Sequence, residues 1–161
     1  MMKKLVVYYS QSNGNTKRIA EMIAEKIGAD ITEIDTVIPY TGSYDQIVRQ
    51  GQEEVNRGFK PQIKEIEKNP GEYEEVIIGT PTWWYTMAPA VLTFLSSTDF
   101  AGKKVAVFQT HGGWPGHTLK DMKSLCKGAD IMSEKAIQFD STGGNRLETP
   151  LDEIENWISG L

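Results

Sequence analysis

Short apolar runs alternate with amphipathic helical patterns along almost the whole of this chain. Runs rich in β-branched and aromatic residues predict buried strands over residues 3–9, 30–34, 75–79, 103–109 and 131–139. Apolar residues at helical spacing predict helices over residues 16–27, 44–57, 89–97, 118–127 and 150–158. Strict β-α alternation is typical of a parallel sheet that is covered by helices on both faces. In such sheets, ligands bind outside the carboxyl ends of the strands, where the strand order reverses.

The turn after the first predicted strand consists almost wholly of hydroxyl, amide and glycine residues. It reads Ser10-Gln11-Ser12-Asn13-Gly14-Asn15-Thr16. The helix that follows has free N–H groups in its first turn, and these groups and the positive end of the helix dipole attract an anion. The side chains that can add hydrogen-bond donors are those of Ser10, Ser12, Asn13, Asn15 and Thr16.

This turn differs from the familiar nucleotide-binding loops. It contains no Lys or Arg, and Lys17 follows Thr16 where a triphosphatase loop G-x-x-x-x-G-K-[ST] needs the lysine first. The dinucleotide pattern G-x-G-x-x-G is absent as well. We therefore expect a neutral nest for one terminal phosphomonoester, the group that FMN carries. The alternative is an ordinary polar turn with a good helix N-cap.

Two more loops at the expected carboxyl edge carry unusual chemistry. The loop after the third strand contains three consecutive large aromatic residues, Trp83, Trp84 and Tyr85. The loop after the fourth strand runs from Thr110 to His117 and holds several glycines, which allow backbone to approach a ligand closely, and both histidines of the chain. Taken singly, each aromatic residue could be a core anchor, but three such loops on one edge favour a binding site.

These residues resemble the flavodoxin-like flavoproteins, and most closely the small bacterial FMN-binding flavodoxins. The resemblance covers nearly the whole chain, with motif matches over residues 10–16, 79–84 and 110–113, although the first loop is one residue longer than the commonest flavodoxin loop. It implies an α/β flavodoxin-like fold over residues 1–161, a single doubly wound five-stranded parallel sheet with helices on both faces. It also implies noncovalently bound FMN.

The resemblance assigns the 5′-phosphate to the hydroxyl and amide side chains of residues 10–16. It assigns the ribityl chain and one side of the isoalloxazine to residues 81–84, and the pyrimidine edge to residues 110–113. The full set of cofactor-binding candidates is Ser10, Ser12, Asn13, Gly14, Asn15, Thr16, Pro81, Thr82, Trp83, Trp84, Tyr85, Thr110, His111, Gly112, Gly113 and Gly116. We expect no catalytic side chain.

Composition excludes several other functions. The net charge of −5, with no basic stripe, argues against a nucleic-acid surface. The lone Cys126 excludes an internal disulfide and fits a reducing compartment. No apolar run reaches membrane length, so we expect a cytoplasmic protein. We also expect a monomer or weak homodimer. His111 and His117 lack neighbours spaced as metal ligands, so no metal site is expected.

The motifs of other protein families with this architecture are absent from the sequence. A response-regulator receiver needs an aspartate at the end of the third strand, where this chain has Gly79 and Thr80. A low-molecular-weight phosphatase needs Cys and Arg around its phosphate loop, and the hydrolase motif G-x-S-x-G is absent.

Two redox functions and one binding function then remain open. The first is a low-potential electron carrier that docks on a reductase and an acceptor protein. The alternative is an FMN-dependent NAD(P)H:quinone-type oxidoreductase, which would be favoured if a protonated His111 or His117 lay near the flavin. The third is a flavin-binding regulatory module that docks a protein through exposed tryptophans. Size and the lack of a nicotinamide-nucleotide pattern favour the carrier.

Overall fold

The computed structural model describes residues 2–11 and 13–161. Its five long strands are β1 (Lys4–Tyr8), β2 (Asp30–Glu33), β3 (Glu75–Trp83), β5 (Lys104–His111) and β6 (Asp130–Gln138). Its α-helices are α1 (Asn15–Ile27), α2 (Tyr44–Asn56), α3 (Pro89–Ser97), α4 (Thr118–Leu125) and α5 (Leu151–Ser159). A short 3₁₀ turn, η1 (Pro70–Glu72), precedes β3, and a two-residue strand, β4 (Thr86–Met87), follows it.

The five long strands pair in parallel in the order β2-β1-β3-β5-β6. The strand order reverses beside β1, because β2 lies on one side of it and β3 on the other. This arrangement confirms the expected doubly wound five-stranded parallel sheet. The strand β4 is an addition that the sequence did not predict: it pairs antiparallel with the end of β3.

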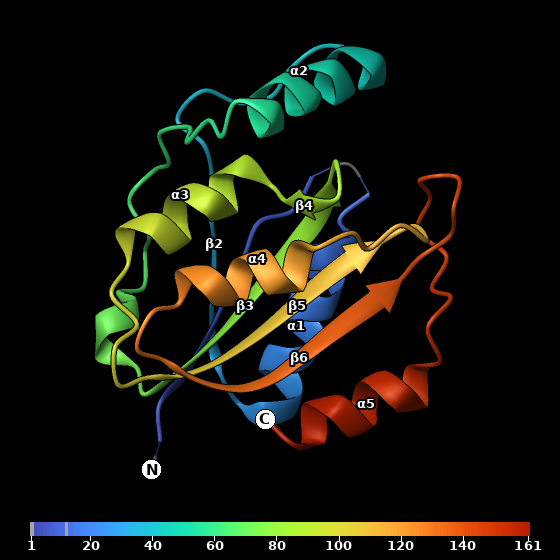
Figure 1. The fold of residues 1–161 in the computed structure, drawn as a ribbon. Coiled ribbons are helices and arrows are strands. Elements are labelled where there is room, and N and C mark those ends of the chain that lie inside the picture. Colours follow the sequence, from blue (N-terminus) through green and yellow to red (C-terminus); the bar gives the residue numbers. More distant parts are fainter. Residues whose placement is uncertain (1, 12) are drawn as a thin grey trace.

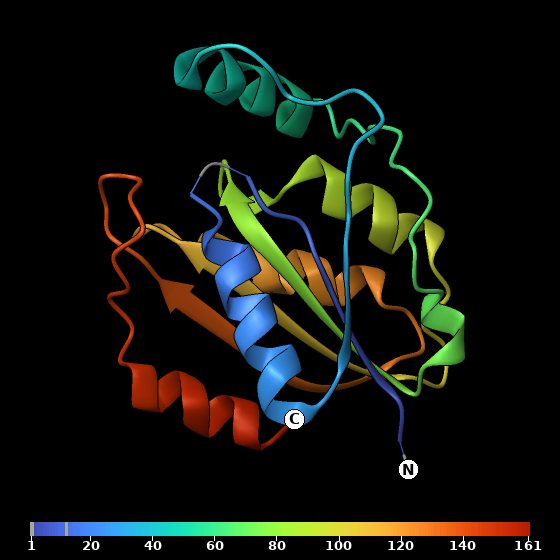
Figure 2. The same cartoon turned by 180° about the vertical axis from the view of Figure 1, so that it is seen from behind.

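Helices cover both faces of the sheet (Figure 1). On one face, α3 and α4 pack on alternate strand residues such as Leu5, Val7 and Ile78. On the other face, α1 and α5 pack on the intervening residues, such as Val6 and Ile77 (Figure 2). Successive strand residues are therefore buried on opposite faces, as β1 and β3 each require in a parallel sheet.

Helix α2 stands apart from both layers, near the carboxyl ends of the strands (Figure 1). It begins with a capping box, in which Ser43 and Gln46 bond reciprocally to each other's backbone N–H. Most of its residues are exposed, and it contacts α3 and β3, with Gly51 against Trp83 at the end of β3. The helix thus forms a roof near the edge where a ligand site is expected. Within the described residues, no helix has the length and apolar character needed to cross a membrane.

Candidate functional site

A cavity of about 240 Å³ lies at the carboxyl edge of the sheet, where the strand order reverses. Its walls come from the turn after β1, the end of β3, the end of β5, the loop after β6, and helix α2. The lining residues are Gln11, Asn13, Asn15, Thr16, Tyr44, Ile47, Val48, Gly51, Pro81, Thr82, Trp83, Trp84, Thr110, His111, Gly112, Phe139, Asp140, Gly143 and Gly144. None of these is Lys or Arg, so the cavity wall itself carries no cationic side chain.

The turn after β1 ends at Gly14, which has a φ of 72° and starts helix α1. Helix geometry leaves the N–H groups of Asn15 and Thr16 without carbonyl partners inside the helix. The next N–H, that of Lys17, donates to Ser10 Oγ at 3.3 Å. Backbone donors and the positive end of the α1 dipole therefore converge on this end of the cavity, as a neutral phosphate nest requires.

The side chains of this turn bind other loops in addition to lining the cavity. The amide of Asn13 donates to the carbonyl of Gly143, and Asn15 Nδ2 donates to the carbonyl of Gly144 at 3.0 Å. The buried hydroxyl of Thr16 pairs with that of Thr110 at 2.8 Å, which ties the turn to β5. Sequence reasoning treated these polar groups as ligand donors, and the structure assigns them bracing contacts as well.

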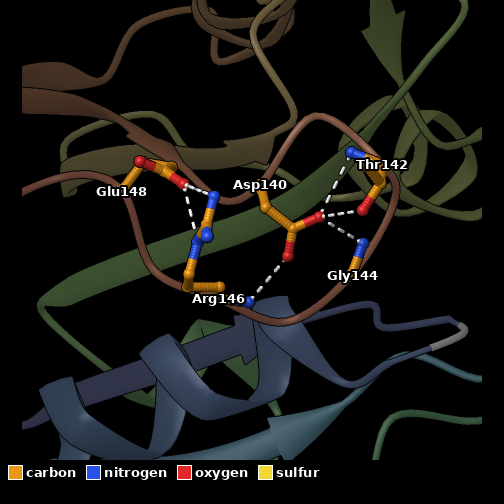
Figure 3. Close-up of polar contacts among 5 residues, drawn as sticks. All are labelled: Asp140, Thr142, Gly144, Arg146 and Glu148. Carbon is orange, nitrogen blue, oxygen red and sulfur yellow. Dashed lines mark hydrogen bonds and ion pairs between the residues drawn. The ribbon is translucent and has the colours of Figure 1, made fainter.

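The loop after β6 is organised by one carboxylate, that of Asp140 (Figure 3). Its Oδ1 accepts from the N–H and hydroxyl of Thr142 and from the N–H of Gly144, and its Oδ2 accepts from the N–H of Arg146. These hydrogen bonds, led by that of the Thr142 hydroxyl, lower the pKa of Asp140 to about 2. The loop thereby presents the carbonyls of Gly143 and Gly144 to the asparagines of the nest.

Glycine at position 144 permits this arrangement. A Cβ added there would lie 2.9 Å from Oδ1 of Asp140 and 3.0 Å from its Cγ. The carboxylate can approach the backbone closely only because that atom is missing. The sequence contains a usable signal for this loop, since Asp140 to Gly144 is a turn-rich segment directly after a strand. The three loops predicted to border the site do not include this segment.

The end of β3 supplies the aromatic wall. Trp83 makes edge-to-face contacts with Tyr9 and Tyr40, with ring centroids 6.0 and 5.1 Å apart. A Cβ on Gly51 would lie 3.1 Å from the Trp83 ring, so helix α2 passes close over this tryptophan at its glycine. Trp83 thus packs in the roof and also lines the cavity.

Trp84 reaches across to the same roof. Its indole Nε1 donates to the carbonyl of Val48 at 3.1 Å, while 38% of the residue stays exposed. Helix α2 was predicted from the sequence, but its role in the site was not. The signal was Gly51, a glycine in the middle of an amphipathic helix, which marks a close approach.

The loop after β5 forms the remaining wall. Buried Gln109 holds this loop to β3, because its Nε2 donates to Thr82 Oγ1 at 2.7 Å and to the carbonyl of Pro115 at 3.0 Å. The N–H of Gly113 donates to His111 Nδ1 at 3.0 Å. Nδ1 accepts this bond, and burial lowers the pKa of His111, because the imidazolium is less well solvated there. Both effects disfavour a protonated His111.

The expected residues fall into three groups. Ten of them line the cavity: Asn13, Asn15, Thr16, Pro81, Thr82, Trp83, Trp84, Thr110, His111 and Gly112. Ser10, Gly14, Gly113 and Gly116 lie outside its lining, and Tyr85 lines a separate groove beside it. Ser12 lies outside the described residues.

The second histidine belongs to a different contact. His117 Nδ1 pairs with Asp121 Oδ2 one turn along, and Thr86 Oγ1 donates to the same oxygen at 2.7 Å. Neither His117 nor Asp121 lines the cavity. Within residues 2–11 and 13–161, no group of three or more His, Cys, Asp or Glu side chains is arranged to hold a metal ion.

Comparison with known proteins identifies the family. A family model described as "Flavodoxin" matches residues 3–159. The chain belongs to the flavodoxin family. This confirms the resemblance that its three loops carry.

Individual relatives and solved structures agree with this membership. Flavodoxin 1 of Escherichia coli K12 is 24% identical over 106 residues, which cover 63% of this chain and 46% of that protein. The match thus spans about half the length of the curated relatives. A candidate flavoprotein from Bacteroides eggerthii superposes with a TM-score of 0.79 at 27% identity, covering 99% of this chain and 97% of the other.

A flavoprotein from Lactobacillus acidophilus, solved in complex with FMN, has the same fold. Its TM-score is 0.71 at 21% identity, and the superposition covers 98% of this flavodoxin chain and 99% of the other.

Proposed function

We propose that this flavodoxin-family chain binds one FMN noncovalently in the cavity and carries electrons between a reductase and an acceptor protein in the cytoplasm. The observation that carries the proposal is the position of the cavity, between a phosphate nest at the start of α1 and an aromatic wall at the end of β3. The family match and the FMN complex of a protein with the same fold support it.

The donor set of the nest fits a phosphomonoester. The free N–H groups of Asn15 and Thr16 and the dipole of α1 would hold the anion, with the Thr16 hydroxyl at the same end of the cavity. Asp140 also lines the cavity, but its oxygens already accept four hydrogen bonds. The N–H and O–H groups of its own loop therefore stabilise this carboxylate.

The rest of the cavity fits the ring system. Trp83 and Trp84 would flank the isoalloxazine, with Ile47 and Val48 of α2 above it, and the loop of Thr110 to Gly112 would border its pyrimidine side. Bound FMN would supply the capacity to accept electrons and pass them on. The chain's own residues would bind the phosphate, orient the ring and exclude water from its buried side.

The lowered pKa of His111 bears on the choice between carrier and reductase. The oxidoreductase alternative gains support from a cationic imidazole near the flavin, and burial together with the Gly113 N–H bond disfavours that cation. A carrier needs no such group, because its partners supply and remove the electrons. This favours the carrier.

The deciding experiment is anaerobic stopped-flow reduction of the FMN-loaded protein. NADPH alone should reduce the flavin very slowly, and addition of a ferredoxin or flavodoxin reductase should make the reduction fast. The accelerated rate should fall as salt increases, because small redox encounters are steered partly by charge.

The matched control is His111→Ala, which should leave the rate with the reductase nearly unchanged. Rapid, saturable oxidation of NADPH by the protein with a quinone, lost in His111→Ala, would replace the carrier with the oxidoreductase.

A further inference from the structure

Helix α2 lacks the buried apolar face that usually fixes a surface helix in place. In this fully described helix, Gly51 and Glu54 are the two buried residues, so its one buried side chain is a carboxylate. Its apolar residues Ile47, Val48 and Val55 are only partly buried. Helices in proteins owe most of their stability to an apolar face packed on the core. The position of α2, apart from both helical layers (Figures 1 and 2), therefore depends on a few specific contacts.

The helix is a locally capped unit between two glycines. Gly42 and Gly58 flank it, with φ angles of 107° and 61°. Its first turn is closed by the capping box of Ser43. At its other end, the N–H of Phe59 donates to the carbonyl of Glu54 at 2.9 Å, as in a Schellman motif. Because these caps lie within the helix and its flanks, they do not tie α2 to the rest of the protein.

The chain departs toward α2 and returns from it at one place. Thr36 and Ile63 form an antiparallel bridge, and the N–H of Val37 donates to the carbonyl of Gln62 at 2.9 Å. The two ends of the excursion are therefore fixed side by side. Residues 43–57, between the two flanking glycines, are called the roof segment below.

A buried hydrogen bond joins the roof segment to the residues before it. Oε1 of Glu54 accepts from the hydroxyl of Tyr40 at 2.6 Å, and its Oε2 accepts from Nε2 of Gln50 at 2.8 Å. Burial and the bond to Glu54 raise the pKa of Tyr40, so the hydroxyl keeps its proton and donates. A buried carboxylate is costly when a donor is lost. Loss of the Tyr40 hydroxyl would therefore favour positions of α2 that expose Glu54 to water.

Tyr40 itself belongs to the wall of the cavity rather than to the helix. Its ring packs edge-to-face on Trp83, with centroids 5.1 Å apart, and Trp83 lines the cavity. On the other side of the same bond, α2 lines the cavity with Ile47 and Val48. The bond from Tyr40 to Glu54 thus connects the aromatic wall to the helix that covers the cavity.

We propose that Glu54 is a positioning residue of the site, and that its bond to Tyr40 latches the roof segment as a hinged lid over the cavity. Opening breaks this bond and the bond from Trp84 Nε1 to the carbonyl of Val48. The flanking glycines supply the hinges, because glycine adopts backbone angles that other residues rarely reach. A ligand enters and leaves through the open state. The latch rests on the geometry of α2, and only its control of FMN exchange rests on the proposed function.

The first test is hydrogen–deuterium exchange of the ligand-free protein. Tyr40→Phe removes the donor hydroxyl and keeps the ring that packs on Trp83. A helix as short as α2 is marginal once it leaves its contacts, so its amides exchange from the open state. They should exchange about tenfold faster or more in Tyr40→Phe, because the lost bond is to a charged group.

Tyr73→Phe is the matched control. The hydroxyl of buried Tyr73 donates to Oδ2 of Asp30 at 2.7 Å, which is the same kind of bond at a place remote from α2. This variant should leave exchange in α2 as in the wild type. Amides of β1 and β5, which report on global unfolding, should respond alike in Tyr40→Phe and Tyr73→Phe.

The second test is stopped-flow fluorescence of FMN mixed with the ligand-free protein. Tyr40→Phe should raise the association and dissociation rates by similar factors and leave Kd nearly unchanged, because the lid opens for entry and for exit. A residue that merely supports the cavity changes mainly the dissociation rate. Glu54→Gln keeps an oxygen that can accept from Tyr40 and should stay near the wild-type rates, whereas Glu54→Ala should behave as Tyr40→Phe does.

Three outcomes would overturn the latch and lid. The first is exchange in α2 that changes equally in Tyr40→Phe and Tyr73→Phe, or in neither. The second is faster exchange in α2 with an unchanged rate of FMN association. The third is a rise in the dissociation rate alone. If FMN does not bind but exchange in α2 responds to Tyr40→Phe and not to Tyr73→Phe, the latch stands and the proposed function fails.

Discussion

A methyl group at position 116 would clash with the backbone of the turn that Trp84 and Tyr85 form between β3 and β4. Gly116 has a φ of 58°, and a Cβ there would lie 2.5 Å from the Cα of Tyr85 and closer still to its carbonyl oxygen. Gly116→Ala therefore carries the left-handed backbone cost, about 1–2 kcal/mol. It also weakens the bond from His117 N to Tyr85 O, which contributes about 0.5–1.5 kcal/mol. The sum is a loss of about 1.5–3.5 kcal/mol in the free energy of unfolding.

The matched control is Gly102→Ala. Gly102 has a φ of 78°, and nothing lies within 4 Å of a Cβ built on it, so only the backbone cost of about 1–2 kcal/mol applies. Urea unfolding should therefore rank the wild type above Gly102→Ala, and Gly102→Ala above Gly116→Ala. Each kcal/mol corresponds to about 2–4 °C in melting temperature for a domain of this size. If the two variants unfold within about 0.5 kcal/mol of each other, the close approach to Tyr85 carries no energetic weight.

Three further predictions concern the nest, the Asp140 loop and His111. Thr16→Val should weaken FMN binding about tenfold, a loss of roughly 1.4 kcal/mol, and leave riboflavin binding nearly unchanged in fluorescence titrations. Equal losses for FMN and riboflavin would show that Thr16 does not bind the phosphate. The pKa of Asp140 is lowered to about 2 in the folded protein, so its stabilisation is present above the unfolded value of 3.8 and is lost as pH falls toward 2. Asp140→Asn should therefore reduce the part of the acid destabilisation that falls between pH 4 and pH 2, and an unchanged pH profile in urea unfolding would count against the loop assignment. For His111, NMR should give a titration midpoint below the ordinary pKa of 6.5, because burial disfavours the imidazolium. A midpoint above 6.5 would favour the oxidoreductase with a protonated His111 near the flavin.

The strand and helix pattern could be predicted from the sequence because each element has a strong local signal. The predicted strand over residues 30–34 corresponds to β2 at Asp30–Glu33, and the helix over residues 89–97 matches α3. Strand β4 could not be predicted in this way. Its turn is made by Trp84 and Tyr85, and neither residue belongs to the usual hairpin signals.

The parts of the candidate site that could be predicted are the polar, aromatic and glycine-rich loops at the strand ends. The parts that were missed depend on contacts between segments that are distant in the sequence. Thr16 and Thr110 are 94 positions apart, and their hydroxyl pair follows from the register of the sheet rather than from either local motif. Ile47 and Val48 read as one face of an ordinary helix, and only the placement of α2 over the cavity gives them a role. The bracing role of Asp140 likewise depends on a loop that closes 130 residues after the nest.

That last contact bears on how the protein is made. Asn13 and its partner Gly143 are 130 positions apart, so Asn13 is synthesised well before the carbonyl that it binds. A nascent chain that has already formed β1, α1 and β3 still lacks the carbonyls that hold the asparagines of the nest in place. Because closing a loop between distant segments must wait for both ends, we expect the nest to be braced only after the segment around Gly143 has been synthesised.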